Sequence, residues 1–444
     1  MSYGVPRRRA RWAHVNGYLF YGEQEPSYPG DPELNARAIR ERWWVREYEH
    51  WFADEKPAIE ATNRRLQAVD VGALDDASLH AHVREALEHV LTVAPLHFSH
   101  RGRELSRQEL RRLAEAEGVE LGDLGAFFAG RSPASSRPAH LVAAIADALR
   151  DGGVDPGSIH DLALVRAVPE AARLLDEYLD EFGQRLLDSY DLACPTLGER
   201  PEVVCASIRA AASPTRRREP MTASLPAMSD ELRRLVEEAA ISAGTEDDDD
   251  GVCIFWPSGL LRRALLEVAR RRGLRDPAAV FEVDRDELYA LLDGRGPSVE
   301  ELHRRLEARL AAAAITPPPS LGTDDTDQRA SDADRPRRAL EGTGIGTDVV
   351  RGRACVVGVD GDGLAHIEPD DVLVAVTTTP GYNAVMPIVA AIATETNMGH
   401  TVICARELGI PAVVGVPGLL SVVQSGDLVE VDAANGVVRV IAPA

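Results

Sequence analysis

The sequence predicts a multidomain protein in which a large all-α N-terminal domain is followed by a smaller C-terminal α/β domain. Three observations support this fold class. Apolar residues recur with helical spacing through most of residues 33–316. A stretch rich in proline and aspartate then interrupts this pattern, and short apolar runs of strand length follow it. We therefore expect a helical domain at 1–315, a flexible linker at 316–338 and an α/β domain at 339–444.

Helical periodicity dominates the N-terminal domain. Two helix starts are marked by capping residues, Asp76 before Ala-Ser-Leu and the capping-box pattern Ser298-Val-Glu-Glu. The predicted helices are 34–48, 56–68, 77–93, 107–117, 139–150, 169–185, 229–243, 260–272, 285–292 and 298–314.

Aromatic residues concentrate near the N-terminus. We interpret them as core packing between the first helices and an irregular N-terminal arm, with an aromatic substrate pocket as the alternative. These residues are Trp12, Tyr18, Phe20, Tyr21, Trp43, Trp44, Tyr48, Trp51 and Phe52.

Two strongly polar segments are predicted to lack regular structure. The acidic run at 246–250 is interpreted as a flexible loop, because a charge run has no fixed geometry for a metal ion. The segment from Thr316 to Pro336 has several prolines and almost no apolar residues, which is typical of a linker. At roughly 3 Å per residue, about 20 such residues span on the order of 60 Å. An attached domain could therefore move between two distant sites.

Short apolar runs after the linker predict a layered α/β domain with two intervening helices. The expected strands are 354–359, 372–376, 391–393, 412–414, 428–432 and 437–441.

One histidine, His400, stands at the centre of this domain. We expect a helix over 401–408, with Gly399 before the histidine and Gly409 ending the helix. The imidazole then lies at the positive end of a helix, where unpaired N–H groups stabilise a dianionic group on or near the ring. Cys404, one turn later on the same face, is interpreted as a small buried thiol.

The stretch around this histidine, His-Thr-Val-Ile-Cys-Ala-Arg-Glu-Leu-Gly-Ile-Pro-Ala-Val-Val-Gly, resembles the phosphohistidine swivelling domain of PEP-utilising enzymes. That family includes phosphoenolpyruvate synthase, pyruvate phosphate dikinase and rifampicin phosphotransferase. The resemblance extends upstream through Asp370-Asp-Val-Leu-Val-Ala-Val-Thr-Thr-Thr-Pro and covers the last hundred residues. It implies that His400 carries phosphate.

The loop before the histidine departs from the family pattern. Relatives have a Gly-Gly pair followed by Ser, Thr or Cys, whereas this chain has Thr-Asn-Met-Gly and a loop shorter by two residues. The candidates for contacting phosphate are the local polar and glycine residues Thr396, Asn397, Gly399, Thr401 and Arg406.

The helical region also resembles the middle, substrate-binding domain of rifampicin phosphotransferase-like proteins. Segments such as Phe182-Gly-Gln-Arg, Glu199-Arg-Pro and Leu260-Leu-Arg-Arg support this resemblance. Gln184 stands where relatives often have histidine, which implies a different substrate. On this basis Gln184, Arg185 and Arg262 are candidate acceptor contacts, although Arg262 is equally interpretable as part of a solvated helix face.

A second group of candidates is the run Leu-His-Phe-Ser-His-Arg, which contains His97, His100 and Arg101. Two histidines three residues apart on one helix face could act as a base or bind a metal. No third ligand is evident from the sequence, so interhelical hydrogen bonding is the main alternative. We predict no metal site.

Composition excludes several classes of protein. The formal net charge of −22 argues against nucleic acid or an anionic membrane as the main partner. No apolar run is long enough to span a bilayer, and the N-terminus lacks the apolar core of a secretory signal. The five cysteines are scattered without a disulfide or metal pattern, which suits the cytoplasm. Lys56 is the only lysine, and no Walker pattern is present.

The resemblance implies the acceptor-binding and phosphohistidine component of a split phosphotransferase. We expect no permanently bound cofactor, with ATP and Mg²⁺ handled by a separate ATP-grasp protein. Phosphate would pass from His400 to a hydroxyl of a small molecule, and the phosphorylated hydroxyl could then undergo elimination, a net dehydration. Two alternatives stay open: a degenerate homologue that binds a ligand or partner without catalysis, and a helical domain that acts without phosphate.

Overall fold

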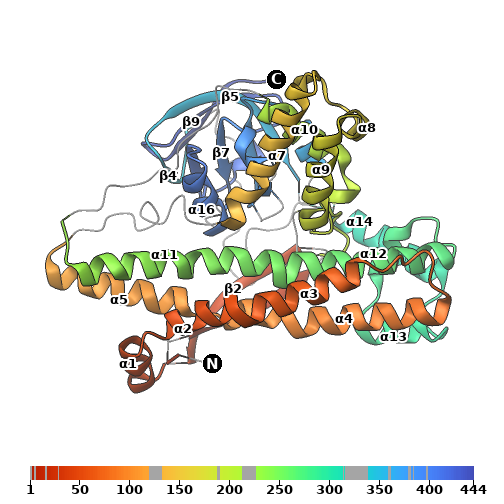
Figure 1. Ribbon diagram of the computed structural model, residues 1–444, viewed down its shortest axis with the longest axis horizontal. Helices are drawn as coiled ribbons and strands as arrows, with labels where there is room; N and C mark the ends of the chain where they lie inside the picture. The colour runs from red at the N-terminus through yellow and green to blue at the C-terminus, as the bar shows by residue number, and fades with distance from the viewer. Residues whose placement is uncertain are drawn as a thin grey trace.

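The fold class expected from the sequence, a large helical region followed by a C-terminal α/β sheet domain, is confirmed by the computed structural model (Figure 1). A layer of long helices runs along the molecule, and the sheet domain lies on one side of this layer together with a second group of helices. The structure describes residues 3–4, 7–15, 18–28, 30–119, 133–187, 191–212, 227–313, 315, 339–358, 362–378, 382–383, 385–396 and 399–444. The predicted linker, 316–338, lies outside the described residues.

The long-helix layer is built from amphipathic helices that bury their apolar stripes against one another. Its apolar clusters contain Trp44 between α2 and α11, and Leu79 and Leu265 between α4 and α12. The helices of this layer are α1 (Pro32–Arg40), α2 (Trp43–His50), α3 (Lys56–Gln67), α4 (Asp76–Ser99), α5 (Gly102–Glu117), α11 (Asp230–Asp250), α12 (Trp256–Arg271), α13 (Arg285–Leu292) and α14 (Val299–Ala313).

Two short π-helical segments join pairs of these helices. Trp51–Glu55 (η1) links α2 to α3, and Gly251–Phe255 (η5) links α11 to α12. The flexible acidic loop expected at 246–250 is therefore wrong, because this run forms the last turn of α11 and Asp249 is fully buried. Cationic and imidazole partners far away in sequence neutralise these carboxylates, which composition alone could not show.

A second group of helices packs against the sheet domain (Figure 1). One continuous apolar core contains Tyr178 and Ile208 from this group together with Tyr382 and Ile392 from the sheet domain. The helices are α7 (Pro133–Asp151), α8 (Leu162–Arg166), α9 (Pro169–Phe182) and α10 (Pro201–Ala211), of which α8 and α10 were not predicted. The sheet domain thus shares its core with part of the helical region.

The sheet has eight strands in the order β3-β10-β9-β5-β6-β7-β8-β4. The central strands β5, β6, β7 and β8 are parallel, and the outer pairs are antiparallel. The six predicted strands correspond to β5–β10, although β5 begins five residues before the predicted start and ends at Val357, whereas β3 and β4 were missed. The bounds are β3 (Leu340–Glu341), β4 (Thr343–Ile345), β5 (Val349–Val357), β6 (Val372–Ala375), β7 (Ala391–Thr394), β8 (Ala412–Val414), β9 (Leu428–Asp432) and β10 (Val437–Ala442).

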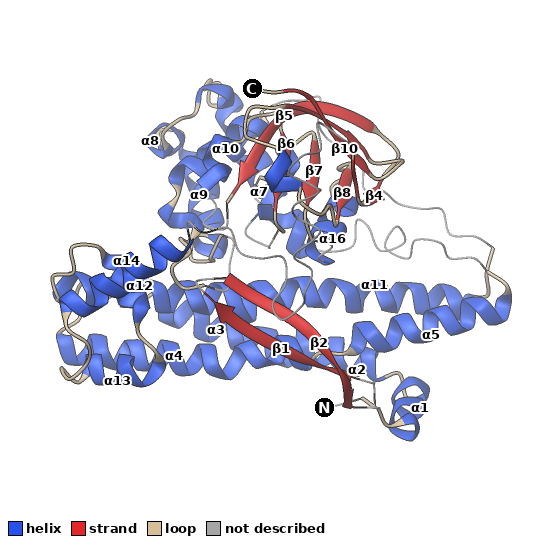
Figure 2. Cartoon of the chain, turned by 180° about the vertical axis from the view of Figure 1, so that it is seen from behind, coloured by secondary structure: helices blue, strands red, loops and turns tan. Residues whose placement is uncertain are grey.

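The irregular N-terminal arm expected from the sequence is wrong. Arg7–Val15 (β1) and Tyr18–Tyr28 (β2) form an antiparallel hairpin outside the sheet domain (Figure 2). The Asn-Gly pair at 16–17 is a strong hairpin signal in the sequence. Core packing of the next aromatic residues is confirmed for Trp44 and Trp51, which are 2% and 0% exposed.

None of the helices in the described part of the chain combines the length and apolar character that a bilayer span requires.

Candidate active site

The position of His400 follows from a strand, a loop and a helix in sequence. All four residues of β7 are buried, so this strand anchors the segment in the middle of the sheet. The helix α16 (Gly399–Glu407) begins after the loop, and His400 is its second residue. Gly409 adopts a φ of +63° just past the helix, as expected for a helix-terminating glycine. The predicted placement of His400 at a helix N-terminus is thus confirmed.

Both ring nitrogens of His400 face protein groups. The Oγ1 atom of Thr378 lies 3.0 Å from Nδ1, and the Oδ1 atom of Asn383 lies 3.0 Å from Nε2. The sulfur of Cys404 is 3.3 Å from Nε2 and donates to Asn383 at the same distance. Thr378 also contacts the hydroxyl of Thr401 at 2.8 Å. Four side chains therefore form one hydrogen-bonded group with the imidazole of His400.

The electrostatics of the ring favour its neutral form. Burial lowers the pKa of His400 to about 3, against the opposing effect of a hydrogen bond to the Thr378 backbone. The imidazole therefore keeps a nitrogen lone pair at neutral pH. A neutral imidazole is the form that attacks phosphorus.

The residues predicted to contact phosphate lie at different distances and orientations from His400. Thr401 is buried within the group around His400, and Gly399 begins α16. The hydroxyl of Thr396 donates to the carbonyl of Val376, so it ties the end of β7 to β6. Arg406 lies in the last turn of the helix, about 9 Å along the axis from His400 at 1.5 Å per residue. Asn397 lies outside the described residues.

Sequence reasoning missed two partners of the imidazole. Thr378 belongs to the Thr-Thr-Thr-Pro run that supports the family resemblance. This resemblance could therefore have indicated Thr378 as a site residue. Asn383 follows in a segment without regular periodicity, 17 residues before His400, and is only 4% exposed. Its contact depends on how β6 and β7 place their following segments in space.

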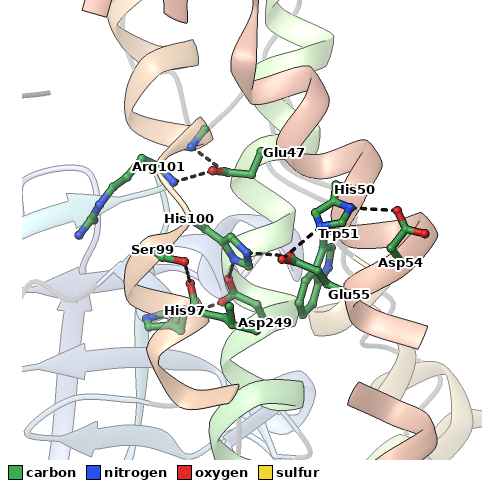
Figure 3. Close-up of polar contacts among 12 residues, drawn as sticks. Glu47, His50, Trp51, Asp54, Glu55, His97, Ser99, His100, Arg101 and Asp249 are labelled. Carbon is green, nitrogen blue, oxygen red and sulfur yellow. Dashed lines mark hydrogen bonds and ion pairs between the residues drawn. The ribbon is translucent and has the colours of Figure 1, made fainter. Parts of the chain in front are cut away.

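Two of the helical candidates, His97 and His100, are brought together by one carboxylate (Figure 3). Nδ1 of His97 lies 2.7 Å from Oδ1 of Asp249, and Nδ1 of His100 lies 2.5 Å from Oδ2. Nε2 of His100 is also 3.2 Å from Oε2 of Glu55. The histidines lie at the end of α4, and Asp249 lies on α11. The sequence indicated a shared helix face but not the carboxylate between them.

Arg101 does not join this histidine group through its side chain. Its backbone N–H donates to Glu47 (Figure 3). Its guanidinium donates to Glu104. Each guanidinium nitrogen of Arg262 is hydrogen-bonded within the protein: Nε and Nη2 donate to Glu199, and Nη1 donates to the Leu192 carbonyl. This set of bonds is typical of a structural cross-link.

The guanidinium of Arg185 has a different environment. It lies 4.7 Å from the ring centre of Phe182 and 5.7 Å from that of Trp256, and Nε donates to the carbonyl of Glu181. Within the described residues, no hydrogen bond or ion pair engages its two terminal nitrogens. Its neighbour Gln184 lies against α12, where a Cβ on Gly259 would come within 1.7 Å of the Gln184 carbonyl oxygen. Close helix packing therefore holds the segment that presents Arg185.

A metal-binding arrangement is not evident. In the part of the chain that the structure describes, no group of three or more His, Cys, Asp or Glu side chains is arranged to hold a metal ion.

Comparison with known proteins agrees with the geometry of the sheet domain. Residues 367–436, which include His400 and its partners, match the PEP-utilising enzyme mobile domain. The sheet domain is therefore similar to this family's mobile domain, and it is called the mobile domain below. The mobile domain thus places His400 at the N-terminus of α16.

Relatives of known sequence extend the similarity into the helical region. A rifampicin phosphotransferase of a Streptomyces species is 27% identical over 325 residues, which cover 66% of this chain and 37% of that protein. An uncharacterised protein of Mycobacterium tuberculosis is 29% identical over 298 residues, covering 65% of this chain and 33% of that protein. A probable phosphoenolpyruvate synthase of Pyrococcus abyssi is 32% identical over 117 residues, 26% of this chain and 14% of that protein. The chain therefore matches about a third of the length of the first two relatives.

Proposed function

We propose that this chain is the phosphohistidine-carrying, acceptor-binding component of a split phosphotransferase that acts in the cytoplasm. A partner ATP-grasp protein binds ATP and Mg²⁺ and phosphorylates His400, which passes the phosphoryl group to a hydroxyl of a small molecule. The observation that carries this proposal is an imidazole held at both ring nitrogens at a helix N-terminus, in a domain that matches the PEP-utilising enzyme mobile domain. Relatives named rifampicin phosphotransferase support a small-molecule acceptor.

The two transfer steps follow from the surroundings of the ring. A lone pair on an imidazole nitrogen forms the P–N bond, and the acceptor oxygen later displaces that nitrogen from phosphorus. Thr378 and Asn383 occupy both nitrogens in the resting arrangement, so one of them must yield its place to the phosphoryl group. Backbone N–H groups at the start of α16 then face the transferred charge.

The acceptor is placed in the helical region on the basis of Arg185. The guanidinium of Arg185 packs against two aromatic rings. Among the described residues, no hydrogen bond or ion pair engages its terminal nitrogens. A planar guanidinium with available N–H groups suits a phosphoryl or carboxylate group. We propose the division 1–315, 316–338 and 339–444, with the mobile domain travelling between the partner and the acceptor. This movement requires the mobile domain to separate from α7–α10, with which it shares an apolar core in the present arrangement. Gln184 is proposed as a neighbouring contact.

The experiment measures phosphate on His400 directly. Intact-protein mass is recorded under alkaline conditions after incubation with ATP, Mg²⁺ and the candidate ATP-grasp protein. Wild type is compared with His400→Ala and with His160→Ala, a matched control because His160 is an exposed histidine outside the mobile domain. Rifampicin and other hydroxyl compounds are then tested as acceptors, and both phosphate esters and dehydrated products are sought.

The expected result is a gain of one phosphate in wild type and in His160→Ala but not in His400→Ala. Loss of that phosphate on adding an acceptor, with a phosphorylated or dehydrated product, completes the reaction. Absence of phosphate on wild type with this donor and with phosphoenolpyruvate overturns the proposal. Phosphate retained in His400→Ala overturns the assignment of the carrier.

A further inference from the structure

The carboxylate of Asp249 is shared by two histidines in a partly buried position of the helical region (Figure 3). Asp249 is 0% exposed, and the side chains of His97 and His100 are 14% and 11% exposed. A buried carboxylate without positive or hydrogen-bonding partners is costly, so the histidines stabilise it. This requirement explains a pairing of one histidine with Asp249, but it does not explain two.

The two histidines differ in what their second nitrogen contacts. Nε2 of His100 faces Glu55 at 3.2 Å, so His100 bridges two carboxylates and both of its nitrogens are used. In His97, Nδ1 faces Asp249 at 2.7 Å, whereas among the described residues no hydrogen bond or ion pair reaches Nε2. The ring is oriented by a carboxylate on one side and has a nitrogen available on the other. This is the arrangement of a carboxylate–imidazole general base.

The backbone conformation near these carboxylates is a second observation that points to a functional site. Asp249 lies just before the π-helical segment η5, and Glu55 is the last residue of the π-helical segment η1. Segments of this type are rare and occur frequently at functional sites. Of the two carboxylates that contact His100, Glu55 therefore comes from such a segment, and Asp249 comes from the last turn of α11 directly before one.

We propose that His97 and Asp249 form the acid–base dyad that activates the acceptor hydroxyl in the phosphoryl transfer from His400. This inference rests on the proposed function and extends it to the acceptor side. The hydroxyl oxygen bonds to phosphorus while the P–N bond to His400 breaks, and the electron pair of that bond returns to the imidazole. The hydroxyl proton passes to Nε2 of His97, and Asp249 stabilises the imidazolium that forms.

The charges around His97 set its protonation. Burial lowers the pKa of His97, but the hydrogen bond with Asp249 and the charges of Asp250 and Asp249 outweigh burial and raise it above its ordinary value. Arg103 on α5 opposes this rise, and His100 shares the same carboxylate. Transfer therefore accelerates as pH rises through this raised pKa, because His97 then loses its proton.

The test separates loading of His400 from transfer to an acceptor in the full-length protein. Loading is measured by intact mass with ATP, Mg²⁺ and the ATP-grasp protein. Transfer is measured as the loss of phosphate from loaded protein on adding rifampicin or molar glycerol. The variants are His97→Gln, Asp249→Asn and His80→Gln, a matched control on the same helix α4. Thermal unfolding checks that each variant is folded.

Acid–base assistance is worth about 100-fold to 10,000-fold in rate, so His97→Gln is expected to slow transfer at least about 100-fold. Loading should change less than about two-fold, and the rise of transfer rate with pH should disappear. His80→Gln should behave as wild type. Asp249 acts through His97 as a positioning residue, so Asp249→Asn should slow transfer and shift the pH profile. Histidine ¹⁵N NMR of wild type should show the proton of neutral His97 on Nδ1.

Each alternative result is decisive. Wild-type transfer rates in folded His97→Gln would overturn the dyad while leaving the proposed function intact. A neutral His97 protonated on Nε2 would do the same, because that nitrogen could not accept a proton. Failure of wild type to load His400 contradicts the proposed function itself, and failure of loaded wild type to transfer faster with either acceptor than with buffer alone contradicts the dyad.

Discussion

The hydroxyl of Thr378 lies 3.0 Å from Nδ1 of His400 and 2.8 Å from the hydroxyl of Thr401. A single side chain outside the predicted set thus connects the ring of His400 to the next residue of α16. Thr378 is only 2% exposed, so its hydrogen bonds have no ready replacement by water.

Replacing Thr378 by valine should impair phosphorylation of His400. The substitution keeps the shape of the side chain but removes the hydroxyl, which leaves Nδ1 and the Thr401 hydroxyl without this partner. We expect a stability loss of about 1–2 kcal/mol and a roughly ten-fold slower loading of His400. Urea unfolding and intact mass at early times measure the two effects.

Thr394→Val is the matched control for this change. Thr394 is also buried in the mobile domain, but its hydroxyl donates to the carbonyl of Thr396. A similar stability loss without slower loading is expected. Equal loading rates in the two variants would show that Thr378 has no role in orienting the ring.

The lowered pKa of His400 predicts a specific dependence of stability on pH. The native state holds the ring neutral down to a pKa of about 3, whereas an unfolded histidine takes up a proton near pH 6.5. Between these values the unfolded chain binds more protons at this position, so the free energy of unfolding falls as pH drops below about 6.5. His400→Gln lacks this titration. The stability advantage of wild type over His400→Gln should therefore shrink from pH 7.5 to pH 5.

Urea unfolding of both proteins at several pH values measures this difference. His97 and His100 have raised pKa values and change stability in the opposite sense, but both proteins contain them, so their effect cancels in the comparison. A difference between the two proteins that stays constant with pH would show that His400 is readily protonated in the native state.

The mobile domain was largely predictable because its signals are local. Buried apolar runs predicted the strands β6, β7 and β8, and Gly399 and Gly409 marked the two ends of the helix whose second residue is His400. Asn383 was not predictable, since its contact with the ring arises only when separate segments meet in space.

The buried carboxylates illustrate the same limit in the helical region. Asp248 and Asp249 belong to a run that resembles a solvated loop in sequence. Asp248 is held by Lys56, 192 residues away in the sequence, and Asp249 by His97, 152 residues away. The positions of α3 and α4 beside α11 determine these pairs. No pattern of neighbouring residues in the sequence predicts them.

The bonds of Arg262 predict a structural rather than a substrate-binding role. Arg262 is 8% exposed, and its guanidinium donates to Glu199 and to the Leu192 carbonyl. Arg262→Met should lower the free energy of unfolding by about 2 kcal/mol, because Glu199 loses its charged partner. Loading of His400 and transfer to acceptor should be unchanged in the folded protein. A large rise in acceptor KM without loss of stability would instead place Arg262 in the acceptor site.

Arg185 should show the opposite behaviour. Its terminal nitrogens contact no protein acceptor among the described residues, so Arg185→Met removes few bonds and keeps much of the stacking against Phe182 and Trp256. Stability should change by only about 1 kcal/mol, because methionine keeps most of the ring contacts and the substitution removes the hydrogen bond from Nε to the Glu181 carbonyl. Transfer from loaded His400 should slow by about ten-fold to 100-fold, because a charge-assisted contact to the phosphoryl group is lost. Arg185→Lys keeps the charge but not the fork of donors, and its partial rescue would separate charge from geometry. Unchanged transfer in both variants would remove Arg185 from the acceptor site.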